Sequence, residues 1–196
     1  MRALRKISLA FVLLVLLAGT RVEAATYKVD ADHTAVSFKV KHLFSWVQGK
    51  FSKFEGTVEY DPANPQGWSA QGSIDVASID TGVAKRDDHL RTKDFFDAAT
   101  FPQITFKTGK VERVSDQKAK VEGLMTMHGV EKPIVLDVDI LGEAKDPWGN
   151  VALGLSATTT INRKDFGINW NQALDTGGVL VGEDVVITLD IAALKV

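Results

Sequence analysis

Hydrophobic and polar residues alternate along most of the chain from residue 36 onward. In the first such stretch, Val36, Phe38 and Val40 alternate with the polar Ser37 and Lys39. Because successive side chains of a β-strand point to opposite faces, this period of two predicts strands with one buried and one exposed face. Alternating stretches occupy residues 36–42, 51–60, 68–76, 104–110, 119–127, 134–140, 151–161 and 185–193.

About eight long strands and one short helix predict an all-β fold, either an antiparallel barrel or a sandwich. The barrel is favoured because closure removes the exposed strand edges that promote aggregation. An eight-stranded antiparallel barrel is just wide enough to hold one slender ligand. The three-residue step from Phe51 to Phe54 also indicates a β-bulge near Ser52 and Lys53.

The segment 81–106 lacks this alternation. Thr81 is a suitable N-cap for a short helix. In that helix Val83 and Leu90 would be apolar, while residues 85–88 would face outward or into the mouth of the barrel. We therefore predict a short helical lid over one end of the barrel.

Three phenylalanines follow this helix. Phe95, Phe96 and Phe101 are expected to point into the interior, and Pro102 moves Phe101 out of helical geometry. These rings would line a dry tunnel, although inward side chains of a small barrel can also simply fill its core. The other residues expected along the tunnel are Phe38, Phe51, Phe106 and Met125.

Polar residues of the lid are candidates for binding a headgroup. Arg86 and His89 would lie at the mouth and hold a phosphate, carboxylate or quinone oxygen, because a planar guanidinium suits anionic oxygens. The alternative is a set of structural ion pairs, Arg163–Asp165 and Arg86 with Asp94 or Asp97.

The first 24 residues have the pattern of a secretory signal peptide. Arg2, Arg5 and Lys6 precede an apolar run over residues 7–17, which is too short to span a bilayer stably. Small residues then predict cleavage after Ala24. We therefore expect an exported, periplasmic protein with one mature domain, residues 25–196.

Composition limits the partners. The chain has 23 basic and 25 acidic residues, and removing the signal peptide takes away four basic residues and one acidic residue, which leaves a net charge of −5. This balance argues against a role at nucleic acid or at an anionic membrane surface, since both require a basic face. Cysteine is absent, so the exported chain must be stable without disulfides.

Neither metal binding nor catalysis is indicated. The four histidines (33, 42, 89 and 128) fall on different elements without ligand-like spacing, and His128, beside Gly129 in a turn, is expected at the surface. The sequence has no G-x-S-x-G nucleophile motif, no cysteine and no glycine-rich phosphate loop. The adjacent carboxylates Asp87 and Asp88 are interpreted as a solvated face.

Six groups of residues along the chain form a characteristic series of motifs. They are Asp30-x-x-His33-Thr with Phe38 and His42-Leu43; Gly49-x-Phe51-x-x-Phe54-x-Gly56; Arg86-Asp-x-His89-Leu-Arg; Asp94-Phe-Phe-Asp97 with Phe101-Pro-x-Ile-Thr-Phe106; Val121-x-Gly123-Leu-Met-Thr-Met-His-Gly129-Val-Glu-Lys-Pro133; and Ile161-Asn-Arg163-x-Asp165-Phe-Gly167 with Val181-Gly182. In this order they resemble the YceI-like family over essentially the whole mature chain.

The resemblance implies an extended lipocalin-like barrel that carries a polyisoprenoid, quinone-type or other long amphiphilic lipid without acting on it chemically. Together with the histidine spacing and the net charge, it leads us to expect no cofactor apart from the lipid, no bound metal, no nucleic acid and no stable membrane insertion. The expected ligand-binding residues are Phe38, His42, Phe51, Arg86, His89, Phe95, Phe96, Phe101, Phe106, Met125, Asp165, Phe166 and Trp170.

Two other functions and a possible homodimer also remain compatible with the sequence. The first alternative is an enzyme of the same shape, in which His89 and Asp165 act as acid and base on a lipid headgroup. The second is a barrel filled by its own side chains. Barrels with apolar mouths often pair them, so a homodimer is also compatible with the sequence.

Overall fold

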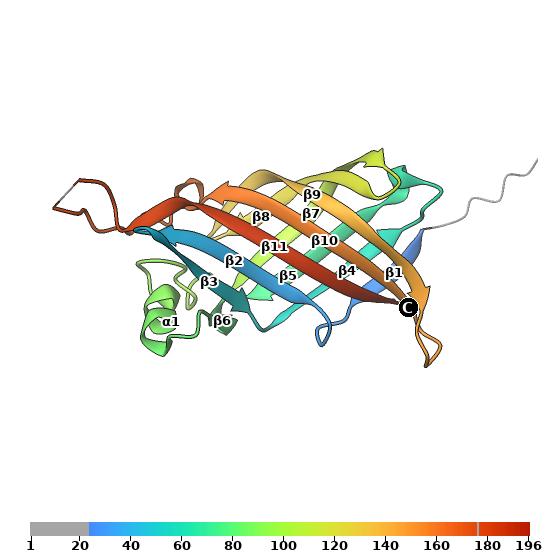
Figure 1. Cartoon of the computed structure of the whole chain (residues 1–196), viewed down its shortest axis with the longest axis horizontal. Coiled ribbons are helices and arrows are strands. Elements are labelled where there is room, and N and C mark those ends of the chain that lie inside the picture. The colour runs from blue at the N-terminus through green and yellow to red at the C-terminus, as the bar shows by residue number, and fades with distance from the viewer. Residues whose placement is uncertain (1–23, 176) are drawn as a thin grey trace, which may run out of the picture.

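Strands and one short helix make up the computed structural model, which describes residues 24–175 and 177–196 (Figure 1). The predicted signal peptide, residues 1–24, lies outside these ranges apart from Ala24. The strands are β1 (Ala25–Val29), β2 (Ala35–His42), β3 (Ser45–Phe51), β4 (Phe54–Tyr60), β5 (Ser69–Asp75), β6 (Ile79–Asp80), β7 (Gln103–Ser115), β8 (Lys118–Met127), β9 (Val130–Lys145), β10 (Val151–Asn162) and β11 (Val181–Lys195). The helix is α1 (Ala84–Arg91), and the 3-10 turns are η1 (Pro65–Gly67), η2 (Val76–Ser78) and η3 (Arg163–Phe166).

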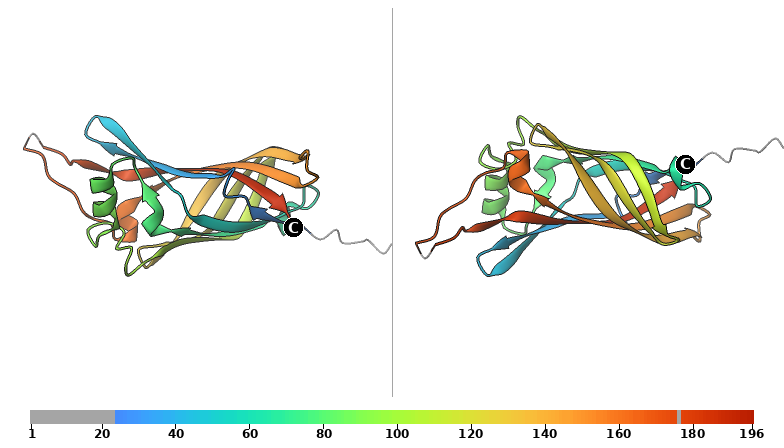
Figure 2. Two further views of the ribbon diagram at one scale, coloured as in Figure 1. Left: turned by 90° about the horizontal axis from the view of Figure 1, so that it is seen from below. Right: turned by 90° about the horizontal axis from the view of Figure 1, so that it is seen from above.

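The strands form one antiparallel sheet that closes on itself. Its order is β1-β4-β5-β7-β8-β9-β10-β11-β2-β3-β6, and β1 also pairs with β11, with Tyr27 opposite Lys195. The result is an elongated barrel, which the two side views show along its length (Figure 2). The predicted closed antiparallel barrel is therefore confirmed.

Eleven strands make an eight-stranded barrel because three of its strands are interrupted. Strand β11 pairs with β2 up to the pair Asp190–Ala35, and with β1 from the pair Ala193–Val29 onward. Because one strand pairs with both in succession, β1 and β2 are two halves of one barrel strand. In the same way β3 and β4 lie beside β2 and β1, and β6 continues β5. The predicted number of eight is thus confirmed.

The irregularity expected at Ser52 and Lys53 is an interruption rather than a bulge. The Ser52 amide donates to the carbonyl of Ser78 at 3.3 Å, and the Lys53 amide donates to the Ser78 hydroxyl at 3.1 Å. Because the turn η2 supplies these acceptors, the strand can break without leaving its amides unpaired. The sequence pattern missed β1, β6 and all of β3 except its last residue.

The predicted helical lid is confirmed, but its N-terminus differs from expectation. Val83 occupies the N-cap position and makes no side-chain cap hydrogen bond. Thr81 instead donates through its amide, at 2.9 Å, and through its hydroxyl to the carboxylate of Asp87. Asp87 is therefore buried, with 5% of its surface exposed, and the expectation that it faces solvent is wrong. Asp88 does face solvent and pairs with Arg91 at 3.0 Å.

Arg91 fastens the helix to the barrel. Its guanidinium donates to the carbonyls of Ala77 and Ile79, both at 2.8 Å, and these residues belong to the turn η2 and the strand β6. The lid is thus joined to one interrupted strand on the rim of the barrel, and Figure 2 shows α1 at that end. Among the described residues no helix has the length and apolarity needed to cross a membrane.

The end opposite the lid is closed by aromatic side chains. Tyr27 is buried and donates to the carboxylate of Glu143, and its ring lies edge-on to that of Tyr60 at 6.4 Å. The ring of Trp68 lies 4.8 Å from that of Tyr60, tilted by 39°. Around them pack the small or branched side chains of Val58, Ile140, Leu153, Leu155 and Ala193.

Candidate functional site

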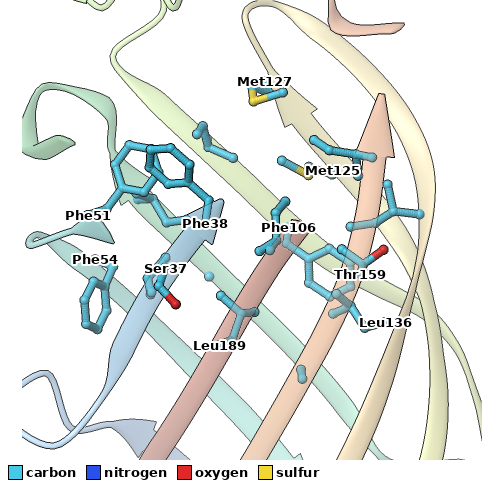
Figure 3. A pocket seen from close by; sticks show the side chains of 18 of the residues that line it. Ser37, Phe38, Phe51, Phe54, Phe106, Met125, Met127, Leu136, Thr159 and Leu189 are labelled. Atoms are coloured by element: carbon cyan, nitrogen blue, oxygen red, sulfur yellow. The ribbon is translucent and has the colours of Figure 1, made fainter. Parts of the chain in front are cut away.

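A cavity of about 860 Å³ runs inside the barrel. Its wall is formed mainly by the inward positions of the alternating stretches, so that Val36, Phe38 and Val40 line it from β2, and a few positions of the other parity, such as Ser37, also border it. In Figure 3, Phe38 and Phe51 lie close together on one part of the wall, and their ring centroids are 5.7 Å apart. The volume lies in the upper part of the range for small-molecule sites, so the barrel holds space for a large ligand.

Glycine in the wall keeps part of this volume open. A Cβ atom on Gly123 would come 2.4 Å from Cζ of Phe106, so the ring of Phe106 lies directly over the bare backbone of the neighbouring strand. The ring therefore covers the wall instead of projecting across the lumen.

An aromatic cluster lies beneath the lid. The ring of His89, on α1, lies 5.0 Å from that of Phe95 and 5.1 Å from that of Trp170, and Phe95 and Trp170 are themselves 5.0 Å apart. Nε2 of His89 is 3.0 Å from a carboxylate oxygen of Asp94, which orients the imidazole. Phe96 continues the contacts to the wall, with its ring 6.1 Å from that of Phe51.

Most of the thirteen residues expected at the site do lie on the cavity wall. They are Phe38, His42, Phe51, Arg86, His89, Phe95, Phe96, Phe106, Met125 and Trp170. Their contact with a ligand stays a prediction.

Three expected residues are not on this wall. Phe101 packs against the turn between β8 and β9, where its ring lies 4.9 Å from that of His128 and over Gly129. Phe166 is fully buried in the packing of η3, and Asp165 on the same turn points to solvent.

His128 is part of the packing rather than a plain surface residue. It has a positive φ of 52°, followed by Gly129 at 75°, which is the backbone of a two-residue hairpin turn. Its Nδ1 lies 3.1 Å from the carbonyl oxygen of Phe166. This contact links the hairpin to η3, so the expectation for His128 is corrected.

The expected ion pairs do not form among the described residues. Arg86 donates to the hydroxyl and the carbonyl of Thr81, at 2.7 and 2.8 Å. The exposed Asp165 is likewise not the partner of Arg163. The arrangement proposed for an enzyme is not assembled on the cavity wall either, since His89 is bonded to Asp94 while Asp165 faces away.

Arg163 also lies on the cavity wall, and its hydrogen-bond partners differ from those expected from the sequence. It is 4% exposed, and its guanidinium donates to the carbonyls of Gly182, at 2.9 Å, and Ile168, at 2.7 Å. Burial lowers the pKa of this guanidinium, and Glu183 opposes that effect. Its Nη2 has no hydrogen-bond partner in the described part of the chain. The neighbouring Asp165 had suggested an ion pair, and nothing in the sequence marked two carbonyls as the partners.

Charge on the cavity wall is uneven. Lys85, Arg86 and Arg163 lie at the lid end, together with the histidines 42 and 89. The acidic residues at the cavity, Glu55 and Glu59, lie on β4, away from these cations, and the opposite end of the cavity reaches the aromatic rings of Tyr60 and Trp68. A molecule with an oxygen-rich head and a long apolar tail would match this gradient if its head lay under the lid.

The fold and the cavity define a closed β-barrel of the lipocalin-like kind, with one elongated apolar interior. The family model described as "YceI-like domain" matches residues 27–193, and the chain belongs to this family. Protein YceI of Escherichia coli O157:H7 is 36% identical over 187 residues, which cover 94% of this chain and 95% of that protein. A UPF0312 protein of Vibrio cholerae is 40% identical over 148 residues, which cover 74% and 78% of the two chains.

Solved structures share the barrel. BcnA of Burkholderia cenocepacia superposes with a TM-score of 0.75 and 29% identity, covering 84% of this chain and 98% of that one. A polyisoprenoid-binding domain from Saccharophagus degradans superposes with a TM-score of 0.62 over 88% of this chain and 99% of its own, at 17% identity. At that identity the second match bears on the fold alone.

Proposed function

We propose that this protein is an exported carrier that holds one long isoprenoid-type or similar amphiphilic lipid in its barrel and leaves it chemically unchanged. The predicted signal peptide supports the periplasm as the place where it works. Its ligand would lie along the cavity with the headgroup under α1 and the tail towards Tyr60 and Trp68.

One observation carries this proposal: the cavity is apolar along its length and has its cationic side chains gathered at the lid end. A barrel filled by its own side chains would leave no space of 860 Å³, and a site for a small polar ligand would not need a wall built from phenylalanine, methionine and branched residues. The name of the Saccharophagus domain adds support, because a protein with the same fold binds polyisoprenoid.

The proposal is tested by filling the cavity. Ala157 on β10 lies on the cavity wall, whereas the next residue, Thr158, faces solvent. Ala157→Phe places a ring in the lumen, and Thr158→Phe places the same ring outside, so the pair is matched in composition and position. Each purified variant is titrated with a polyprenyl phosphate in detergent below its micelle concentration.

We expect the mature wild-type chain and Thr158→Phe to bind the lipid with one-to-one stoichiometry. Ala157→Phe should bind it about tenfold or more weakly, since burial of several methylene groups is lost at about 0.8 kcal/mol each. Circular dichroism checks that both variants remain folded. Equal binding by the two variants, or no binding by the wild type, would reject the carrier function.

A further inference from the structure

The lid end of the barrel carries exposed apolar side chains on two neighbouring loops. The β2–β3 hairpin turns at Leu43 and Phe44, and Phe44 is 100% exposed. The loop before β11 lies beside it, because the amide of Leu43 donates to the carbonyl of Leu180 at 3.0 Å. Trp46 is 52% exposed and Val179 is 47% exposed. We call Leu43, Phe44, Trp46 and Val179 the apolar tip.

The hairpin turn is unusual for a plain surface turn. Two-residue hairpin turns favour asparagine and glycine because they need positive φ angles. Here Leu43 adopts a φ of 51°, which is unfavourable for a branched aliphatic residue, and Phe44 extends into solvent. The turn is therefore strained at Leu43 and exposes the ring of Phe44, although polar residues at both positions would give a more stable turn.

The charge around the apolar tip differs from that of the rest of the mature chain. The hairpin around the tip carries Lys39 and Lys41 and no acidic residue, and the loop before β11 carries Asp175, although the mature chain as a whole is acidic. Lys41 is paired directly across the hairpin from Trp46, and Nζ of Lys39 lies 5.2 Å from the centroid of the Trp46 ring. Lysines that flank an exposed tryptophan are suited to the interface of a bilayer with anionic lipid.

The apolar tip is continuous with the cavity. His42 and Val47, on the inner face of the same hairpin, line the cavity, as does Leu180 of the adjacent loop. Both loops project from the end of the barrel that carries α1 (Figures 1 and 2). A surface that touched the apolar tip would therefore lie beside the lid end of the cavity.

We propose that the apolar tip docks the lid end of the barrel on the surface of a bilayer that contains anionic lipid, from which the ligand enters and to which it returns. This inference rests on the proposed carrier function and names the partner of the same cavity. The net charge of −5 had argued against an anionic membrane, but that average conceals the local basic hairpin. A second copy of the chain fits less well, because four side chains fall well short of the roughly 800 Å² per partner of a stable interface.

The far end of the barrel supplies a matched control. Trp148, between β9 and β10, is 85% exposed, and its turn is built on the carboxylate of Asp146, which accepts hydrogen bonds from the amides of Trp148 and Asn150. Trp148→Ser removes an exposed aromatic ring from a turn whose charged residues are one lysine and one aspartate, Lys145 and Asp146. Phe44→Ser removes an exposed aromatic ring from the hairpin that carries Lys39 and Lys41.

The experiment is a flotation assay with the full mature chain and vesicles of either pure phosphatidylcholine or an equimolar mixture with phosphatidylglycerol. We expect wild type and Trp148→Ser to float with the mixed vesicles and to dissociate as salt is added. Phe44→Ser should partition about tenfold or more weakly, the effect of losing one buried aromatic side chain. Lys39→Gln combined with Lys41→Gln should weaken binding to the mixed vesicles only.

Trp46 provides a second readout. Vesicles containing brominated phosphatidylcholine should quench the fluorescence of wild type more than that of Trp46→Phe. The inference is overturned if the wild type does not float, if Phe44→Ser and Trp148→Ser lose equal affinity, or if sedimentation shows a dimer that Phe44→Ser dissociates. Titration of each variant with polyprenyl phosphate without vesicles tests the carrier function separately, and Phe44→Ser should bind that lipid as the wild type does.

Discussion

The ring of Phe38 lies against the backbone of Gly49, its cross-strand partner, because Gly49 has no side chain to keep it away. A Cβ atom on Gly49 would come 2.4 Å from Cζ of Phe38 and 2.8 Å from Cγ2 of Thr81. The ring of Phe106 likewise lies over Gly123, although Gly123 is not its direct cross-strand partner, because Phe106 is paired with Met125. Glycines thus set how far two aromatic rings extend into the cavity, and the free volume depends on them.

This relationship makes Gly49→Ala a test of the cavity shape. The added methyl group should push the Phe38 ring into the lumen and lower the affinity for a long-tailed lipid about tenfold, with a loss of about 1–3 kcal/mol in the free energy of unfolding from overpacking. Gly109→Ala is the control, because its Cβ would meet only a carbonyl oxygen at 3.6 Å. Ligand titration and urea unfolding measure the two effects, and an unchanged affinity would show that the ring does not border the ligand.

The affinity for a series of ligands with increasing tail length tests whether the tail is buried in the same cavity. Each buried methylene contributes about 0.8 kcal/mol, so one five-carbon isoprene unit could contribute ~4 kcal/mol. Several units would exceed the practical limit of about 18–21 kcal/mol for non-covalent binding, so ordering of the chain must offset part of the gain. We expect affinity to rise with tail length and then level off once the cavity is full. Affinity that does not depend on length would argue against tail burial.

How far the fold follows from the sequence differs between its elements. The alternation of Val36, Phe38 and Val40 with lysine and serine predicted both a strand and its inward face, because that pattern has no other structural explanation. The strand β3 was missed because Trp46 places an apolar side chain on its exposed face and Gly49 leaves an inward position without a side chain, which together weaken the alternation. The eight-stranded count survived this omission because β3 and β4 form one interrupted strand.

The site was less predictable than the fold. Phe101 follows Phe95 and Phe96 in the same segment, yet it covers Gly129 outside the cavity, which depends on a hairpin that lies far along the chain. In the sequence Asp87 looks like a solvated carboxylate, but in the structure it accepts a hydrogen bond from the amide of Thr81. The position of Phe101 was decided by a contact with residues far along the chain, and that of Asp87 by a hydrogen bond across the first turn of the helix that the assignment of Thr81 as the N-cap did not include.

The buried guanidinium of Arg163 leads to a prediction about stability. Arg163→Leu leaves the carbonyls of Gly182 and Ile168 without their donors, and we expect the free energy of unfolding to fall by about 2–4 kcal/mol. The adjacent Lys164→Ala breaks only an exposed pair with Glu183, so its cost should stay below about 1 kcal/mol. Urea unfolding compares the two variants. Similar losses for both would mean that Arg163 contributes no more than a surface charge.

Tyr27 should make the barrel sensitive to alkaline pH. Burial, followed by the hydrogen bond to Glu143, raises the pKa of Tyr27 above its ordinary value. A raised pKa means that the folded chain keeps the phenol proton after the unfolded chain has lost it, at a pKa of about 10. The free energy of unfolding should therefore fall above that pH by up to about 1.4 kcal/mol per pH unit for this residue.

Tyr27→Phe isolates that contribution. The variant lacks the titrating phenol, so its free energy of unfolding should fall less steeply above pH ~10 than that of the wild type. Urea unfolding at a series of alkaline pH values gives both slopes. Parallel curves would show that the alkaline loss comes from other groups, such as the lysines or Tyr60.

The most direct measurement is mass spectrometry of whatever the protein carries when it is isolated from its own cells without detergent. If the barrel is a lipid carrier, organic extraction should release an intact amphiphile with a long apolar tail, in a one-to-one ratio to the protein and in reduced amount from Ala157→Phe. A chemically altered lipid would indicate the enzyme. An empty barrel that also fails to take up polyprenyl phosphate would contradict the account.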